Sequence, residues 1–283
     1  MSTNLGWVLA LAVLVLAAAL GAVLAGFRRF ARLARTDVES LLRTSAPPPQ
    51  GLITEEMLGG LPEPVRRYLT YAGVVGRPFV GTVRLTQAGR MQPNPGQPWF
   101  PLSAEEHYSV RPPGFVWDAV LRLGPFPLVR ARDMYREGAG NMLIKALGLF
   151  PIADVVGPEM DQGSMMRYLS EMIWFPTAFL GDNVSFEPVD DRSARVTLTD
   201  SGRTVSATMI FDEIGKLVDF AAERYRTVDR GFVLERWSTP VDEYGELAGL
   251  RLPVRGRAVW KLADGDLEYI DVTVAELQYD VGL

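Results

Sequence analysis

The feature that most constrains this chain is a run without any charged side chain, from Leu5 to Phe27. A helix rises about 1.5 Å per residue, so this run reaches roughly 30 Å, the thickness of the hydrocarbon layer of a bilayer. We therefore predict an N-terminal transmembrane helix that anchors the chain, over residues 1–27. A cleaved signal peptide is the alternative, because the small residues from Ala18 to Ala22 would suit a cleavage site. Residues 1–6, however, lack the basic side chains with which signal peptides begin.

Four arginines follow this run directly: Arg28, Arg29, Arg32 and Arg35. Basic residues that flank a span tend to stay on the cytoplasmic side, so we expect a single-pass protein of the inner membrane with its domain in the cytoplasm. Residues 27–43 keep helical spacing, and we weigh two interpretations: a helix whose arginines lie at the membrane surface among headgroups, and a solvated stalk. Pro47 to Pro49 end any helix. Residues 28–53 are thus predicted to be a juxtamembrane basic helix and a proline-rich linker.

The remainder, residues 54–283, has the composition of one soluble domain. Charged residues make up 22% of the chain and hydrophobic residues 48%, which is enough for a sizeable core. The net charge of -5 divides into +3 for residues 1–43 and -8 for the rest. Because an acidic domain repels phosphate backbones, we expect no nucleic-acid partner.

Neither a metal nor a cofactor is predicted. The chain has no cysteine and one histidine, so the usual zinc ligands are missing. It also lacks a Walker loop, a dinucleotide fingerprint, an EF-hand loop and a G-x-S-x-G elbow.

After Gly73 the hydrophobic pattern takes a period of two, which is typical of strands. The clearest examples are residues 80–86, 115–123, 128–136, 140–147, 204–211, 216–226, 257–262 and 267–279. We count about ten strands joined mostly by short turns, and predict a curved antiparallel sheet, a half-open barrel. In the last strand the alternation changes phase between Val274 and Ala275, which predicts a β-bulge.

Helical patterns precede and interrupt these strands. Residues 54–72 form the first, and the second begins at Pro158 and continues to Trp174, before Pro176. We expect the second helix to pack across the sheet, which gives a β-dominated α+β fold.

The second helix concentrates methionine, whose flexible thioether adapts to irregular apolar partners. We predict that a hydrophobic or lipid-like ligand lies between this helix and the sheet, with a plain, unevenly packed core as the alternative. The candidate pocket residues are Met160, Met165, Met166, Leu169, Met172, Trp174 and Trp117.

Polar candidates on the same helix are Glu159, Asp161, Arg167 and Glu171. Paired carboxyls can catalyse hydrolysis when one pKa is raised, so a carboxylate-dependent enzyme is an alternative function. A structural interpretation is simpler, because acids suit the helix start and Arg167 and Glu171 form an i,i+4 pair. The single histidine, His107, is interpreted as ordinary surface, with general-base catalysis as the alternative. We assign no catalytic residue.

Five segments resemble an uncharacterised, membrane-anchored bacterial family of unknown function: Leu61–Leu69, Pro112–Trp117, Gly157–Gly163, Trp174–Ala178 and Arg236–Pro240. The resemblance covers about residues 60–280 and implies no activity. The predicted layout also resembles the lipoprotein-carrier half-barrel, by shape analogy only.

We predict a membrane-tethered binding module rather than an enzyme, with membrane lipids and an apolar or lipid ligand as its partners. A scaffold protein that binds a partner through its sheet edges is a further alternative.

Overall fold

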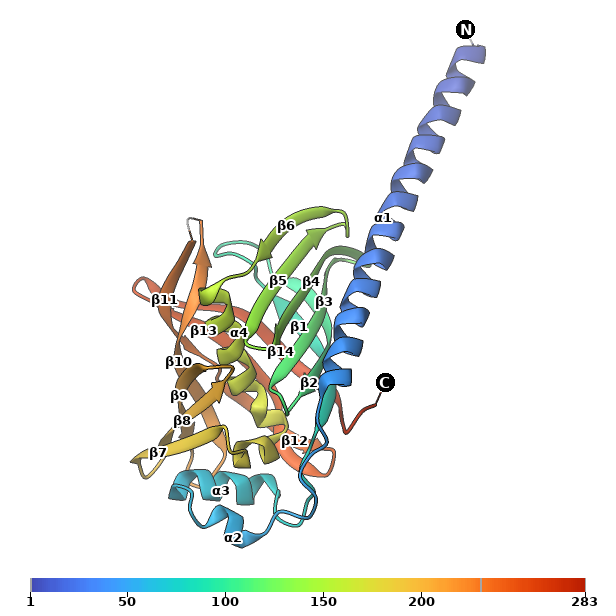
Figure 1. The fold of residues 1–283 in the computed structure, drawn as a ribbon. Coiled ribbons are helices and arrows are strands. Elements are labelled where there is room, and N and C mark those ends of the chain that lie inside the picture. The colour runs from blue at the N-terminus through green and yellow to red at the C-terminus, as the bar shows by residue number, and fades with distance from the viewer. Residues whose placement is uncertain (1, 230, 283) are drawn as a thin grey trace.

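The computed structural model describes residues 2–229 and 231–282, so the outer domain bounds Met1 and Leu283 lie outside it. A long N-terminal helix leads into a strongly curved sheet (Figure 1). The helices are α1 Ser2–Thr44, α2 Glu55–Leu58, α3 Glu63–Ala72 and α4 Pro158–Glu171, followed by the 3-10 turns η1 Met172–Trp174 and η2 Pro176–Leu180. The strands are β1 Thr82–Met91, β2 Phe100–Ser109, β3 Gly114–Leu123, β4 Phe126–Arg136, β5 Ala139–Ala146, β6 Phe150–Val155, β7 Val184–Asp190, β8 Ser193–Asp200, β9 Arg203–Phe211, β10 Leu217–Val228, β11 Gly231–Ser238, β12 Val241–Leu247, β13 Leu250–Leu262 and β14 Gly265–Tyr279.

Helix α1 is continuous but has two environments. Within the described residues it is the one helix that is long and apolar enough to cross a membrane, and none of its residues from Gly6 to Ala25 is buried. From Gly26 onward it packs along β2, β3 and β4, where Phe30 and Leu41 are buried. Arg132 of β4 pairs with Asp37 of this half at 3.0 Å. The second half of α1 is therefore packed on the domain and does not stand free as a stalk.

The described strands form one antiparallel sheet of fourteen, in the order β6-β5-β4-β3-β2-β1-β14-β13-β11-β10-β9-β8-β7, with β12 paired to β13. The predicted curved antiparallel sheet is confirmed, but the count of about ten strands is too low. Strands β7 and β12 are short and contain no buried residue, so they lack the buried–exposed alternation on which the prediction relied.

The predicted bulge in the last strand is present. Thr86 and Gln87 of β1 are consecutive, yet they face Glu276 and Val274 of β14, so Ala275 is left over. An extra residue of this kind bends a strand and increases its twist, which helps the sheet to curve.

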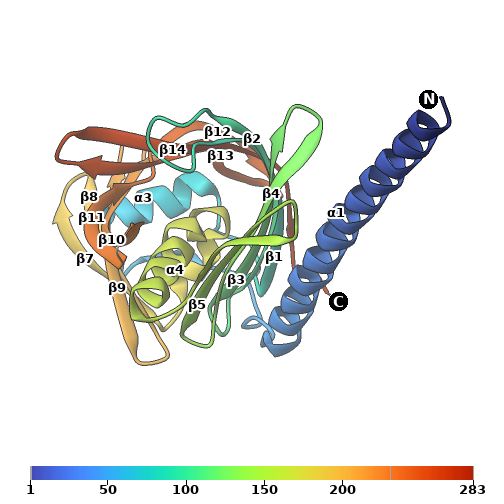
Figure 2. The same cartoon turned by 90° about the horizontal axis from the view of Figure 1, so that it is seen from above.

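Helix α4 lies on the concave side of the sheet, where it packs mainly against β5 and β10 and also against β4 and β9 (Figure 2). It begins at Pro158, as predicted, because the ring fixes a helical φ and the missing N–H is not needed in the first turn. Most of its side chains are buried in the core that it shares with α3 and the sheet. The predicted helix packed across the sheet is confirmed.

Candidate functional site

A cavity of about 170 Å³ lies between the concave face of the sheet and the C-terminal half of α4. One ordered water needs roughly 10–15 Å³ of such space, so this cavity holds many waters or one small apolar group. Its walls are mainly hydrophobic and come from most of the sheet. The large apolar lining residues are Met91, Trp117, Met142, Ile173, Trp174, Trp237, Ile270 and Val272.

Two of the predicted pocket residues, Trp117 and Trp174, line this cavity. The indole N–H of Trp117 donates to Gln87 Oε1 at 2.9 Å, and that of Trp174 donates to the Pro253 carbonyl at 3.0 Å, which fixes both rings. The other predicted residues are buried in the core and are not part of the lining: Met160, Met165, Met166, Leu169 and Met172. The methionines of the lining, Met91 and Met142, come from strands instead.

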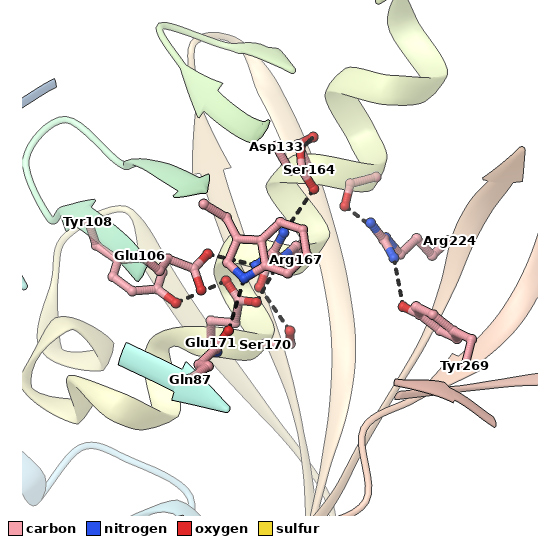
Figure 3. Close-up of polar contacts among 12 residues, drawn as sticks. Gln87, Glu106, Tyr108, Asp133, Ser164, Arg167, Ser170, Glu171, Arg224 and Tyr269 are labelled. Atoms are coloured by element: carbon pink, nitrogen blue, oxygen red, sulfur yellow. Dashed lines mark hydrogen bonds and ion pairs between the residues drawn. The ribbon is translucent and has the colours of Figure 1, made fainter. Parts of the chain in front are cut away.

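One side of the cavity is a charged group that we call the Arg167 cluster: Glu106, Asp133, Arg167 and Glu171. The Arg167 guanidinium donates from Nη2 to Glu106 Oε1 at 2.7 Å, from Nη1 to Asp133 Oδ2 at 3.0 Å and from Nε to Glu171 Oε1 at 2.7 Å. Figure 3 shows these acids gathered around the arginine. The i,i+4 pair predicted on the helix is thus one edge of a larger buried network.

The Arg167 guanidinium also packs against two aromatic rings. Its central carbon lies 4.8 Å from the ring centroids of both Phe115 and Trp117. The register of the sheet explains the arrangement, because Glu106 of β2 faces Trp117 of β3, which in turn faces Asp133 of β4. One row across three strands therefore places two acids on either side of an indole, and α4 lays Arg167 over that row.

The Arg167 cluster has three acids and one cation, and the pKa values of two of the acids, Glu106 and Glu171, are raised. Burial raises the pKa of Glu106 well above its usual value, and the negative charge of Glu171 raises it further against the lowering effect of Arg167. Burial likewise raises the pKa of Glu171, again opposed by Arg167. The second oxygen of Glu106, Oε2, is buried without a hydrogen-bond partner. These observations favour the neutral acid at Glu106.

A second cation, Arg224 of β10, lies on the other side of the cavity. Its Nε donates to the Gly163 carbonyl of α4 at 2.9 Å, and its Nη1 lies 3.4 Å from the Tyr269 hydroxyl. The guanidinium carbon stacks over the ring of Trp237 at 4.9 Å. The Thr239 hydroxyl, also in the lining, is buried without a partner.

The remaining predicted polar residues lie away from the cavity. Asp161 is buried, but its Oδ1 accepts from the Gly140 N–H at 2.8 Å and its Oδ2 pairs with Arg203 at 2.7 Å. Glu159 is half-buried in the first turn of α4. His107 lies on the opposite face of β2, against α1, and burial lowers its pKa. The arginines predicted at the membrane surface, Arg28, Arg29, Arg32 and Arg35, are all exposed.

Sequence reasoning missed Glu106, Asp133, Arg224 and Thr239. A signal existed for the first two, because each occupies an inward position of an alternating strand, Glu106 between Ala104 and Tyr108. An acid in that phase is rarely buried without a partner. Arg224 and Thr239 carry no comparable local signal.

Within residues 2–229 and 231–282, no three acidic or histidine side chains come together in a way that could hold a metal ion.

Fold and site together define a class: a long apolar N-terminal helix joined to an open antiparallel sheet that encloses a helix and a largely apolar cavity. The chain belongs to a family of unknown function, DUF6544, whose family model matches residues 51–272. That range begins after α1 and contains every residue of the Arg167 cluster. A search of curated proteins found no match.

Several solved structures are similar in shape at low sequence identity. A DUF1329 family protein from Desulfovibrio piger has a TM-score of 0.42 and 12% identity, over 82% of this chain and 95% of that one. A LolA superfamily protein from Nitrosomonas europaea has a TM-score of 0.41 and 8% identity, over 80% and 93%. A putative outer membrane lipoprotein-sorting protein domain from Vibrio parahaemolyticus has a TM-score of 0.38 and 9% identity, over 72% and 87%. At these values the likeness carries no functional argument.

Proposed function

We propose that this protein is a membrane-tethered binding module that holds an apolar or lipid-like ligand between its sheet and α4. The observation that carries the proposal is the cavity, in which tryptophan, methionine and isoleucine side chains face about 170 Å³ of space. Ligand sites in proteins are concave and mostly apolar, with a few polar groups that orient the ligand. The volume suits a small ligand or one part of a larger one.

The apolar run of α1 supports the tether. From Gly6 to Ala25 none of its residues is buried by the rest of the chain, which suits a segment whose solvent is lipid. A ligand drawn from the bilayer would then cross little water on its way to the cavity.

The Arg167 cluster favours binding over catalysis. Both oxygens of Glu171 are engaged, one by Arg167 and the other by the Tyr108 hydroxyl at 3.2 Å. A network of this kind fixes α4 against the sheet, and it leaves little freedom for proton transfer to a substrate. The alternative, a carboxylate-dependent enzyme, now depends on Glu171, because Glu159 and Asp161 do not line the cavity.

Native mass spectrometry of the full chain, released from lipid nanodiscs without detergent, tests the proposal. We expect a co-purifying apolar molecule in the wild type and its loss in I270W, which places a larger side chain in the cavity. T273W is the matched control, because Thr273 is exposed on the same strand and outside the lining. An empty wild-type protein, or equal occupancy in both variants, would contradict the proposal.

We further propose that the domain lies on the cytoplasmic side, since the basic residues follow the apolar run and none precedes it. A reporter fused to the C-terminus, active only outside the cytoplasm, should remain inactive. Activity of that reporter would reverse the assignment.

A further inference from the structure

The charges around the cavity leave one cation without a counterion. Six charged residues belong to the lining: Asp133, Arg167, Glu171, Arg224, Arg255 and Arg257. The first three pair within the Arg167 cluster. Arg255 pairs with Asp271 at 3.2 Å, and Arg257 pairs with Asp242 at 2.8 Å. Of the four arginines in this lining, Arg224 is the one with no carboxylate within 4.0 Å among the described residues.

The missing counterion matters because the Arg224 guanidinium is partly withdrawn from water. The guanidinium is half-buried and lies over the rings of Trp237 and Trp260, at 4.9 and 5.6 Å, where it is partly withdrawn from water. Its Nε and Nη1 have neutral partners, the Gly163 carbonyl and the Tyr269 hydroxyl, while Nη2 has no acceptor among the described residues. A half-buried cation of this kind is stabilised by an anion that accepts from its free N–H groups.

We infer that the ligand of the cavity is an amphipathic anion, whose carboxylate or phosphate oxygen accepts from Arg224 while its hydrocarbon part lies against the tryptophan wall. The inference rests on the proposed function and names the class of ligand. The distribution of groups supports it, because apolar contacts from Trp117, Trp174 and Ile270 surround the same space. Arginine is also the side chain best suited to bind two oxygens of one anionic group.

Photocrosslinking of the full chain in nanodiscs tests the inference. Two diazirine probes of equal chain length are compared, a fatty acid and a fatty alcohol, and the label on cavity peptides is quantified by mass spectrometry. In the wild type we expect the acid to label about tenfold more than the alcohol, because hydrogen bonds to charged groups are the stronger ones.

Two variants separate charge from structure. R224Q removes the charge but carries an amide N–H at the position of Nε, so it still offers a donor to the Gly163 carbonyl, whereas R224K has a carbon there and loses that bond. R224K keeps the positive charge and should keep a preference for the acid, whereas R224Q should label equally with both probes. R236Q is a control, since Arg236 is exposed and outside the lining.

The outcomes distinguish the proposed apolar binding site from the inferred anionic ligand. Equal labelling of the wild type by acid and alcohol would overturn the anionic ligand and leave the apolar binding site in place. Labelling by neither probe would overturn both. Competition by a long-chain alkyl phosphate, compared with the matching carboxylate, then shows which anion the site prefers, and either preference supports the inference.

A different observation, two apolar turns beside α1, carries a second inference. Leu123 and Phe126 flank the β3–β4 turn, and Phe150 and Ile152 follow the β5–β6 turn. All four are between 59% and 72% exposed. Large apolar side chains gathered at one place on a surface indicate an interaction site.

These turns lie where the apolar part of α1 leaves the domain (Figure 1). A Cβ at Gly26 of α1 would lie 2.9 Å from the Gly148 carbonyl oxygen in the β5–β6 turn, and one at Gly148 would lie 2.5 Å from the Phe27 amide nitrogen. The two backbones are therefore in direct contact at this level. If α1 spans the bilayer up to Phe27, the turns reach the plane of the headgroups.

We propose that the β3–β4 and β5–β6 turns insert into the membrane surface beside the anchor and so fix the orientation of the domain. The occupant of the patch is the bilayer that receives α1. Aromatic side chains such as Phe126 and Phe150 are suited to the boundary between headgroups and acyl chains.

The absence of cysteine makes a direct test simple. Single variants F126C and F150C of the full chain carry an environment-sensitive fluorophore in nanodiscs, and I214C is the control. Ile214 is also exposed, at 62%, but it lies in the β9–β10 turn, which packs next to α3, since a Cβ at Gly215 would lie 2.9 Å from the Arg67 carbonyl oxygen. We expect blue-shifted emission and quenching by doxyl-labelled lipid at positions 126 and 150, and neither at 214. Water-like emission without quenching at 126 and 150 would overturn the proposal.

Discussion

Replacing Arg167 by methionine should destabilise the domain strongly. The change keeps an unbranched apolar stem but removes the guanidinium, so Glu106, Asp133 and Glu171 lose their cation, and their side chains are at most 12% exposed. Removing one partner of a buried ion pair typically costs about 3–5 kcal/mol. We expect a loss at the upper end of this range at neutral pH, because Asp133 and Glu171 both lose the cation that they share.

The control for this change is R84M, on the outer face of the sheet. Arg84 pairs with Glu105 at 2.5 Å, but the two side chains are 28% and 46% exposed. Exposed pairs of this kind contribute about 0–1 kcal/mol, so R84M should be nearly neutral. Urea unfolding of the full chain in detergent micelles, followed by tryptophan emission, gives the free energy of unfolding of each variant.

The pH dependence provides a sharper test of the same reasoning. Loss of Arg167 removes the main influence that lowers the pKa of Glu106 and Glu171, so both acids hold their protons more tightly in the folded R167M protein. The folded state then binds more protons than the unfolded state, and its stability falls as pH rises above the unfolded pKa of about 4.5. The deficit of R167M should therefore shrink toward acid pH. A deficit below about 1 kcal/mol at neutral pH, or one that does not change with pH, would refute the buried ion network.

Three further predictions concern stability. In the wild type, burial raises the pKa of Glu106, so the free energy of unfolding should fall as pH rises from about 4.5. In E106Q the free energy of unfolding should depend less on pH, which denaturant titrations at several pH values would show. G148A should lower the free energy of unfolding by about 1–3 kcal/mol, and by more than G124A, because both positions have positive φ but only a Cβ at 148 would clash with α1. Thermal melts of the two variants, measured side by side, test this order. F30A should cost about 3–5 kcal/mol, because Phe30 of α1 is buried against the sheet, whereas L33A at an exposed position of the same helix should change little. Limited proteolysis would show α1 released from the sheet only in F30A.

The elements of this protein that could be predicted from its sequence are those with a local signal. The charge-free run before Arg28 needs only composition, and the start of α4 at Pro158 needs only the geometry of proline. The bulge at Ala275 follows from a change of phase in one strand. Several strands that alternate were found for the same reason, whereas β7 and β12, which contain no buried residue, were not.

The cavity and its charges were decided by the tertiary structure. Glu106 and Asp133 are 27 residues apart in the sequence and lie on either side of Trp117 only because three strands pair in one register. The methionines of α4 are core residues, because the helix packs against β4, β5, β9 and β10 and most of its residues are buried. Trp117 and Trp174 reach the cavity from different elements. That Arg224 lacks a counterion can be seen only after every charge around the cavity has been paired. Periodicity is a property of one segment and can be read from it, whereas burial and ion pairing depend on distances between segments, which the fold alone sets.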